Sequence, residues 1–357
     1  MTSSSQPGPR KAERLLFVLF LLSLPMLNPW VRGDGVGYYA FARAPLIEHS
    51  LDFTHDYQQA NTSFRENRVD EYGQPRPEFH TRTGHLDNHF TVGPAILWAP
   101  FLLLAHAGVL VARSLGATVA ADGFSTPYRI AMALATAIYG FLGLLISFRL
   151  ARKYVDETWA LLATLAIWWA SSLPVYMYFN PSWSHAHSAF VVALFLWYWH
   201  ETRDARTLSQ WILLGAISGL MLDVYYANVM LFTILPVEAL RDYSAAWRKA
   251  TPSTPSVLQL VARHIAFAVM LIVYMLPTLI AHRIIYGSIL ETGYIPIRDW
   301  FWTSPYLFSV LFSSNHGLLS WTPILLFAVI GLFAFWRSVP RTRLAFLAAA
   351  LAFYYFI

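Results

Sequence analysis

The 357-residue sequence contains no cysteine, which excludes disulfides, thiolate nucleophiles and cysteine-ligated zinc. Charge is also scarce, because charged residues make up only 13% of the chain whereas 57% of the residues are hydrophobic. A soluble globular domain carries about twice that share of charge. The net charge of +5 is of the size that cytoplasmic loops of a membrane protein supply, so nucleic-acid binding is not indicated. The composition therefore predicts an integral membrane protein.

Apolar runs of about 15 to 23 residues recur along the chain, long enough to lie in hydrocarbon as helices, in which every backbone polar group is paired. They predict an all-α polytopic membrane protein consisting of one membrane domain over residues 1–357. The candidate spans are 15–31, 91–112, 127–148, 158–177, 186–200, 209–223, 225–240, 260–282, 318–336 and 343–357.

The first apolar run follows a basic tail over residues 1–14 that carries Arg10, Lys11 and Arg14. A signal peptide has the same order of features, but no small-residue cleavage site follows this run. We therefore expect a cytoplasmic tail and a retained first transmembrane helix over 15–31. At the other end the sequence stops inside an apolar run, which we interpret as a C-terminal truncation.

The longest polar stretch covers 32–90, too rich in carboxylates for a bilayer and far longer than a tight connection. The topology depends on the next segment, 91–112. If this segment crosses the membrane while the N-terminus lies inside, the later basic clusters fall outside. If it lies at the surface, those clusters join the N-terminal one inside, as the positive-inside rule requires. We prefer this arrangement to one with the N-terminus outside, which has to translocate the basic tail. The expectation is an extracytoplasmic loop over 32–126 with juxtamembrane helices, followed by a helix bundle over 127–357.

The first candidate site is the motif Gly33-Asp34-Gly35-Val36-Gly37-Tyr38-Tyr39, directly after the first span. Glycine lets the backbone turn sharply and approach a ligand. Asp34 is a candidate general base for a hydroxyl acceptor, and Tyr38 and Tyr39 are candidate substrate-binding residues. The alternative is a solvated aspartate that caps the following helix.

A second candidate is the stretch from His80 to His89, which has three histidines and an aspartate within ten residues. Asp87 is a second candidate carboxylate, and His85 and His89 are candidate substrate-binding residues. Histidine and aspartate also bind zinc, but this spacing matches no zinc motif. We therefore expect no metal and no other cofactor, with a divalent metal as the less favoured alternative.

The third candidate is the segment Asn180 to Ser188, where proline follows asparagine in the manner of a helix start. That interpretation does not explain His185 and His187. A helix N-terminus with a nearby histidine is suited to hold a phosphate. Because two residues on a helix point about 200° apart, only one of the two histidines is expected to face a given ligand.

Further polar residues lie later in the sequence. Asp223 stands where two apolar segments meet, and a turn at the membrane interface is its simplest explanation. The stretch from His282 to His316 is rich in cations, of which Arg283, Arg298 and His316 are candidate partners for a lipid phosphate.

With these residues in view, the layout resembles the GT-C superfamily of membrane glycosyltransferases, in particular bacterial relatives of protein O-mannosyltransferases and the lipid A aminoarabinose transferase. The resemblance rests on Asp34 in GDGVGYY after the first helix, on the segment Asn88 to Ala95, and on Ser313 to Pro323, SSNHGLLSWTP. It implies a GT-C-like bundle, an essential acidic residue at Asp34 and juxtamembrane helices in the first loop. Relatives usually have two neighbouring acidic residues there, whereas Gly35 follows Asp34, so the second carboxylate stays open among Glu48, Asp52 and Asp87.

The expected function is transfer of a hexose or pentose from a polyprenyl-phosphate donor to a hydroxyl of a lipid, glycan or protein acceptor. The expected location is a bacterial inner membrane, with the site facing the periplasm and membrane lipid as a further partner. The alternative is a transporter or flippase of lipid-linked glycans. Such proteins place ionisable groups near the bilayer midplane and often contain inverted repeats.

Overall fold

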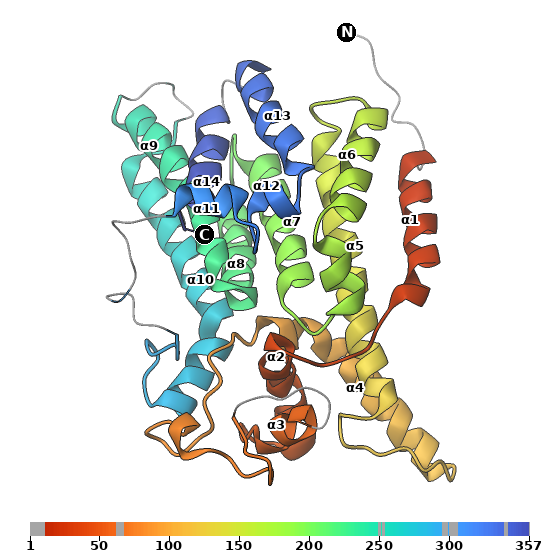
Figure 1. The fold of residues 1–357 in the computed structure, drawn as a ribbon. Coiled ribbons are helices and arrows are strands. Elements are labelled where there is room, and N and C mark those ends of the chain that lie inside the picture. The colour runs from red at the N-terminus through yellow and green to blue at the C-terminus, as the bar shows by residue number, and fades with distance from the viewer. Residues whose placement is uncertain are drawn as a thin grey trace. The chain divides into compact units, whose positions relative to one another are not determined.

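The computed structural model describes residues 11–61, 68–248, 251, 254–294, 299, 306–338 and 342–356 (Figure 1). Within these ranges every regular element is a helix, and β pairing is limited to two isolated bridges, Val69–Pro75 and His80–Leu86. The all-helical fold expected from the apolar runs is confirmed for the part of the chain that the structure describes.

The polar stretch after the first helix is itself partly helical. The α-helices of the first half of the chain are α1 (Lys11–Ser23), α2 (Asp34–Arg43), α3 (Thr54–Asn61), α4 (Gly93–Ser114), α5 (Thr126–Ala151) and α6 (Glu157–Ala170). Those of the second half are α7 (His185–Thr202), α8 (Leu208–Val224), α9 (Ile234–Trp247), α10 (Val257–Tyr286), α11 (Leu307–Phe312), α12 (Leu318–Trp321), α13 (Leu325–Ser338) and α14 (Arg343–Phe356). Shorter helical turns are η1 (Leu24–Met26), η2 (Ala44–Glu48), η3 (Pro77–Phe79), η4 (Val175–Phe179) and η5 (Tyr226–Thr233).

Helices α4, α5 and α10 are long and apolar enough to cross a membrane, judged by length and composition. Large apolar side chains on their surfaces point away from the protein, as shown by Leu104, which is 74% exposed, and Leu258, which is 77% exposed. Apolar surface of this kind is stable when lipid covers it. These features are those of an α-helical membrane protein.

Three of the expected spans differ from the observed helices, and a proline or serine marks the early end of two of them. Helix α1 ends at Ser23, because Pro25 follows and opens the turn η1. Helix α6 ends at Ala170 rather than near residue 177, since Ser171 leaves the helical conformation and Pro174 precedes the turn η4. The expected span 225–240 is divided between η5 and α9.

The described residues form two compact units, which are considered separately. Unit 1 comprises Met1–Arg76 and Pro94–Trp197, and unit 2 comprises Pro77–Gly93 and Tyr198–Ile357. In unit 1, α1, α5 and α6 lie side by side (Figure 1) and share one apolar core. Phe20 of α1 stacks on Phe141 of α5 with ring centroids 4.4 Å apart, and Trp168 of α6 lies 6.0 Å from Phe141.

The two ends of unit 1 differ in chemistry. At one end, the start of α1 meets the end of α5 through Glu13 and Arg149, which form an ion pair of 3.0 Å. At the other end, the chain that follows α1 returns beside the start of α5, where the Tyr39 hydroxyl donates to the Gly123 carbonyl at 2.7 Å. Helices α1 and α5 are therefore antiparallel, and the chain between them leaves and returns at the same end of the unit.

In unit 2, α8 and α10 pack along their length (Figure 1), because glycines allow the two backbones to approach closely. A Cβ atom added to Gly215 or Gly219 would overlap the backbone carbonyl of Phe267 or Leu271 on α10. Helix α14 packs against η5 and α9. The close seam between α8 and α10 fixes the positions of the polar side chains at its end.

Candidate functional site

Two of the motifs singled out in the sequence lie together in unit 1. The chain before α2 is fastened to the segment between η4 and α7 by polar bonds. The indole Nε1 of Trp183 donates to the Arg32 carbonyl at 2.9 Å, and Arg32 Nε donates to the Asn180 side-chain oxygen at 2.8 Å. The Arg32 guanidinium also lies 4.6 Å from the Trp30 ring centre, close enough for a cation–π contact.

The glycines on either side of Asp34 are required by this packing. Gly33 has a φ of +55°, in the left-handed region that glycine adopts without strain, and a Cβ atom there would lie 2.9 Å from the Trp183 ring. A Cβ atom on Gly35 would overlap the Ser182 side chain. Farther along α2, the buried Tyr38 hydroxyl accepts a hydrogen bond from Ser184 at 3.0 Å.

Asp34 begins α2 and its side chain is exposed. Among the described residues, no hydrogen bond or ion pair holds the Asp34 carboxylate. Desolvation by the surrounding chain raises the pKa of Asp34 above its ordinary value of 3.8. An accessible, unpaired carboxylate with a raised pKa is suited to accept a proton from a substrate.

The two histidines of the third motif occupy different surroundings, as their helical spacing predicts. The centre of the His185 ring lies 4.1 Å from that of Tyr176 and 5.7 Å from that of Trp183. Trp183 in turn packs against Gly33, the residue before Asp34. His187 is fully buried between Trp98, at 5.2 Å, and Tyr139, at 5.6 Å. His185 is therefore the one of the two that a ligand near α2 can reach.

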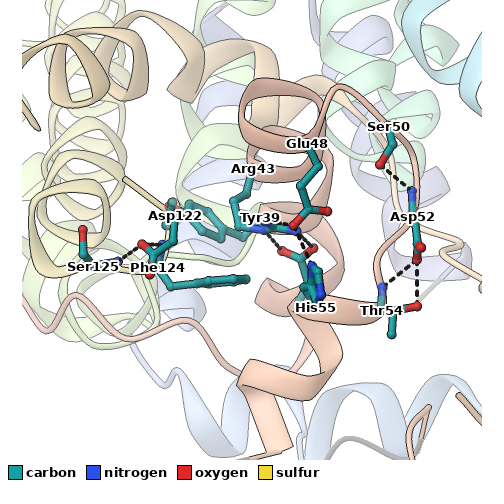
Figure 2. Close-up of polar contacts among 12 residues, drawn as sticks. Tyr39, Arg43, Glu48, Ser50, Asp52, Thr54, His55, Asp122, Phe124 and Ser125 are labelled. Atoms are coloured by element: carbon teal, nitrogen blue, oxygen red, sulfur yellow. Dashed lines mark hydrogen bonds and ion pairs between the residues drawn. The ribbon is translucent and has the colours of Figure 1, made fainter. Parts of the chain in front are cut away.

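A buried ion-pair network joins α2 to α3 (Figure 2). Arg43, at the end of α2, donates from Nε and Nη2 to the two carboxylate oxygens of Asp56 at 2.7 and 2.6 Å, and from Nη1 to Glu48 at 2.7 Å. Arg43 and Asp56 are 1% and 3% exposed. Burial raises the pKa of Asp56 to about 6, while the hydrogen bonds from Arg43 oppose this shift. Burial opposes the charge of Arg43, but its hydrogen bonds to Asp56 and Glu48 outweigh that effect and raise its pKa.

The same region is fixed by capping contacts that Figure 2 also shows. Asp52 accepts from the backbone amide of Thr54 at 2.9 Å and so caps the start of α3. Asp122 accepts from the amides of Phe124 and Ser125 at 2.8 and 2.9 Å just before α5. Of the carboxylates considered as a partner for Asp34, Glu48 is thus an ion-pair partner and Asp52 a helix cap.

The histidine-rich stretch lies in unit 2 against the end of α10. The Tyr286 hydroxyl donates to Asp87 at 2.5 Å, and Arg82 donates to the Tyr286 carbonyl at 2.5 Å. The His85 ring nitrogen lies 3.0 Å from the Thr83 hydroxyl, which in turn donates to the Ile285 carbonyl. Hydrogen bonds to the end of α10 therefore position Asp87 directly and His85 through Thr83.

Two buried ionisable side chains lie farther along the same seam. Asp223 and His282 are both 0% exposed, and neither the carboxylate oxygens nor the ring nitrogens form a hydrogen bond with any described residue. One helical turn before His282, the Thr278 hydroxyl accepts a hydrogen bond from the Val92 amide at 2.8 Å. A Cβ atom on Gly93 would overlap the backbone of Asp223. The first residue of α4 therefore packs directly against the backbone of Asp223.

Aromatic rings lie around His282. The His282 ring lies 5.5 Å from Tyr286 and 6.4 Å from Tyr226. Tyr294 lies 6.3 Å from Tyr226 and 4.6 Å from His89. His89 therefore belongs to the same polar and aromatic group as His282.

The remaining phosphate-binding candidates have separate surroundings. Arg283 is exposed and donates to the Gly287 carbonyl at the end of α10. The exposed His316 stacks on Trp321 with ring centroids 4.9 Å apart. Arg298 lies outside the described residues. Within the described ranges, no group of three or more His, Asp or Glu side chains is arranged to hold a metal ion.

Sequence reasoning did not anticipate three features: the Arg43–Asp56 pair, the complete burial of both Asp223 and His282, and the bond between Arg32 and Asn180. An arginine within the otherwise apolar stretch Tyr38 to Ile47 was the available signal for the first, since a cation there requires a partner. The other two involve residues far apart in the sequence. Comparisons with protein-family models, curated proteins and solved structures found no match to this chain.

Proposed function

We propose that the protein is a membrane glycosyltransferase that moves a sugar from a polyprenyl-phosphate donor to an acceptor hydroxyl, with Asp34 as general base. The observation that carries this proposal is the state of Asp34. Its carboxylate is exposed, unpaired among the described residues and raised in pKa, while Gly33 and Gly35 on either side of it pack closely against Trp183 and Ser182.

In the reaction, the acceptor hydroxyl gives its proton to Asp34 as its oxygen attacks the anomeric carbon. The bond between that carbon and the phosphate oxygen breaks, so polyprenyl monophosphate leaves and the anomeric configuration is inverted. His185, beside Trp183 at the start of α7, can donate a hydrogen bond from its neutral ring to the phosphate oxygen on which negative charge develops. Arg283 and His316 remain candidate phosphate-binding residues of unit 2, and Asp87 remains a candidate second carboxylate.

The antiparallel arrangement of α1 and α5 supports the proposed topology. If both helices cross the membrane, the chain between them leaves and returns on one side, so α4 adds no net crossing. The ion pair of Glu13 with Arg149 places the basic cluster Arg149, Arg152 and Lys153 at the same end as the basic start of α1. By the positive-inside rule that end is cytoplasmic, and Asp34 faces the periplasm of a bacterial inner membrane.

The test is transfer of a radiolabelled sugar from a polyprenyl-phosphate donor by purified protein. Asp34→Asn keeps the shape of the side chain but removes its basicity, so it should abolish transfer without lowering thermal stability. Asp52→Asn is the matched control, because asparagine also caps helices and this exposed aspartate should be dispensable. Turnover by the Asp34 variant would exclude the assignment of the base.

A transporter or flippase of lipid-linked glycans is the second candidate, favoured by one observation. Asp223 and His282 are ionisable side chains buried without described hydrogen-bond partners between helices, as in many transporters. Reconstitution in liposomes separates the two functions. Movement of a lipid-linked glycan across the bilayer without sugar transfer would favour the transporter.

A further inference from the structure

A cavity of about 250 Å³ lies in unit 1 beside α2 and α3. Its walls come from the chain before α2, from α2 and α3 themselves, and from the start of α5. The lining includes Trp30, Tyr39, Asp56, Ala60, Phe124 and Arg129. Asp34 does not line it, so the cavity is distinct from the proposed catalytic position.

Most polar groups of the cavity wall are already satisfied. The Asp56 carboxylate is engaged on both oxygens by Arg43, and the Tyr39 hydroxyl is bonded to the Gly123 carbonyl. The negative charge of Asp56 is therefore compensated by a residue outside the cavity lining. This pairing reduces the repulsion that Asp56 exerts on an anion in the cavity.

Arg129 is the exception. Its Nε atom is buried and has no hydrogen-bond partner among the described residues, and its Nη2 atom makes only a long contact of 3.4 Å to the Thr126 hydroxyl. No carboxylate forms an ion pair with Arg129 in the described part of the chain. Buried donors without acceptors are costly, so in native proteins such a donor is satisfied by protein, by water or by a bound anion.

We propose that this cavity binds the phosphate group of a small molecule or of a lipid headgroup through Arg129. A guanidinium offers parallel N–H donors that match phosphate oxygens, and the bond is strong because both partners are charged. The cavity is smaller than the usual ligand pocket of about 300 Å³ or more, so it suits a headgroup-sized ligand. Trp30 and Phe124 provide apolar wall for the remainder of that ligand. The amides of Phe124 and Ser125 are used by Asp122, which leaves the Arg129 side chain as the anchoring group.

Binding is tested on the full chain in detergent without any sugar donor, so the result does not depend on the proposed transfer reaction. Two probes are titrated at constant ionic strength, inorganic phosphate and short-chain phosphatidic acid, with uncharged diacylglycerol as the matched lipid control. The thermal unfolding midpoint as a function of probe concentration gives the dissociation constant. The variants are Arg129→Gln, Arg129→Lys and Ala60→Leu, which fills the cavity without changing its charge. Arg14→Gln, an exposed arginine on α1, is the control.

Wild type and the Arg14 variant should bind at least one probe, and Arg129→Gln and Ala60→Leu should each bind at least tenfold more weakly. Arg129→Lys should be intermediate, because lysine keeps the charge but loses the paired donors. Binding of phosphatidic acid alone would identify a lipid headgroup, whereas equal binding of inorganic phosphate would identify a soluble ligand. The proposal is overturned if wild type binds neither probe or if Arg129→Gln binds as well as wild type. Should Arg129→Gln fail to fold, unchanged binding by Ala60→Leu would overturn it equally.

Discussion

Replacing Arg43 by methionine tests whether the buried network of Figure 2 holds the loop between α1 and α5 in place. Methionine keeps the apolar stem but leaves the Asp56 carboxylate, which is 3% exposed, without its two donors at 2.7 and 2.6 Å. Removing one member of a buried pair costs about 3–5 kcal/mol, because the other charge stays behind uncompensated.

The cost should depend on pH in a defined direction. Burial already raises the pKa of Asp56 to about 6 in the presence of Arg43, and loss of Arg43 raises it further. At low pH the carboxyl is protonated with or without Arg43, so the penalty is small. It should grow as the pH rises through about 6, because the folded variant must then either bury a bare carboxylate or hold a proton that the unfolded chain releases.

The assay is thermal unfolding in detergent followed by tryptophan fluorescence. For a unit of this size, a change of one kcal/mol in the free energy of unfolding shifts the thermal unfolding midpoint by about 2–4 °C. Arg43→Met should therefore lower that midpoint by at least about 6 °C at neutral pH. Arg149→Met is a matched control, since Arg149 also binds Glu13 through two atoms, at 3.0 and 3.1 Å, but is 53% exposed. An exposed pair contributes about 1 kcal/mol or less.

A double variant completes the test. Replacing both partners of a buried ion pair by apolar residues is often neutral, so Arg43→Met with Asp56→Leu should recover much of the lost stability. Two results would refute the conclusion that this buried ion pair stabilises the fold. One is an equal unfolding midpoint for Arg43→Met and Arg149→Met, and the other is a double variant that unfolds at no higher temperature than Arg43→Met.

Three further predictions concern the candidate sites. The rate of sugar transfer should rise with pH along an acid limb whose apparent pKa lies above 3.8, because Asp34 must lose its proton to act as a base; a pH profile of kcat/KM with no such limb would contradict this. Gly35→Ala should lower stability by about 1–3 kcal/mol through overlap with Ser182, and Ser182→Gly should restore it in the double variant, as measured by thermal unfolding. Asp223→Asn should unfold at the same or a higher temperature than wild type, since a neutral amide replaces a buried carboxylate with no described hydrogen-bond partner; a large loss of stability would reveal a charge partner.

The helical class and most helix positions were predictable from local sequence. In hydrocarbon, a single apolar run can hydrogen-bond all of its backbone N–H and C=O groups only as a helix. Accordingly, α5 and α10 begin and end within a few residues of the expected spans. The ends of α1 and α6 were less predictable, because proline and serine stop a helix inside a run that hydropathy alone continues.

The sequence also singled out Asp34, because glycines flank an acidic residue beside the first span, and its role as a base stays a prediction. Its raised pKa was not predictable from sequence, since that depends on which distant segment removes water from the carboxylate. The contact of Arg32 with Asn180 joins residues 148 positions apart, and no local pattern encodes it. The grouping of Asp87 with Tyr286 has the same origin.

Composition and periodicity alone therefore determined that this chain is a helical membrane protein with a polar loop after its first helix, since burial in lipid acts on each segment separately. Only the tertiary structure decided that Arg43 is neutralised by Asp56, whereas the buried Nε atom of Arg129 has no hydrogen-bond partner among the described residues. The physical reason is that pairing and desolvation are properties of a position in space. Side chains of the same type acquire opposite roles according to what the fold places beside them.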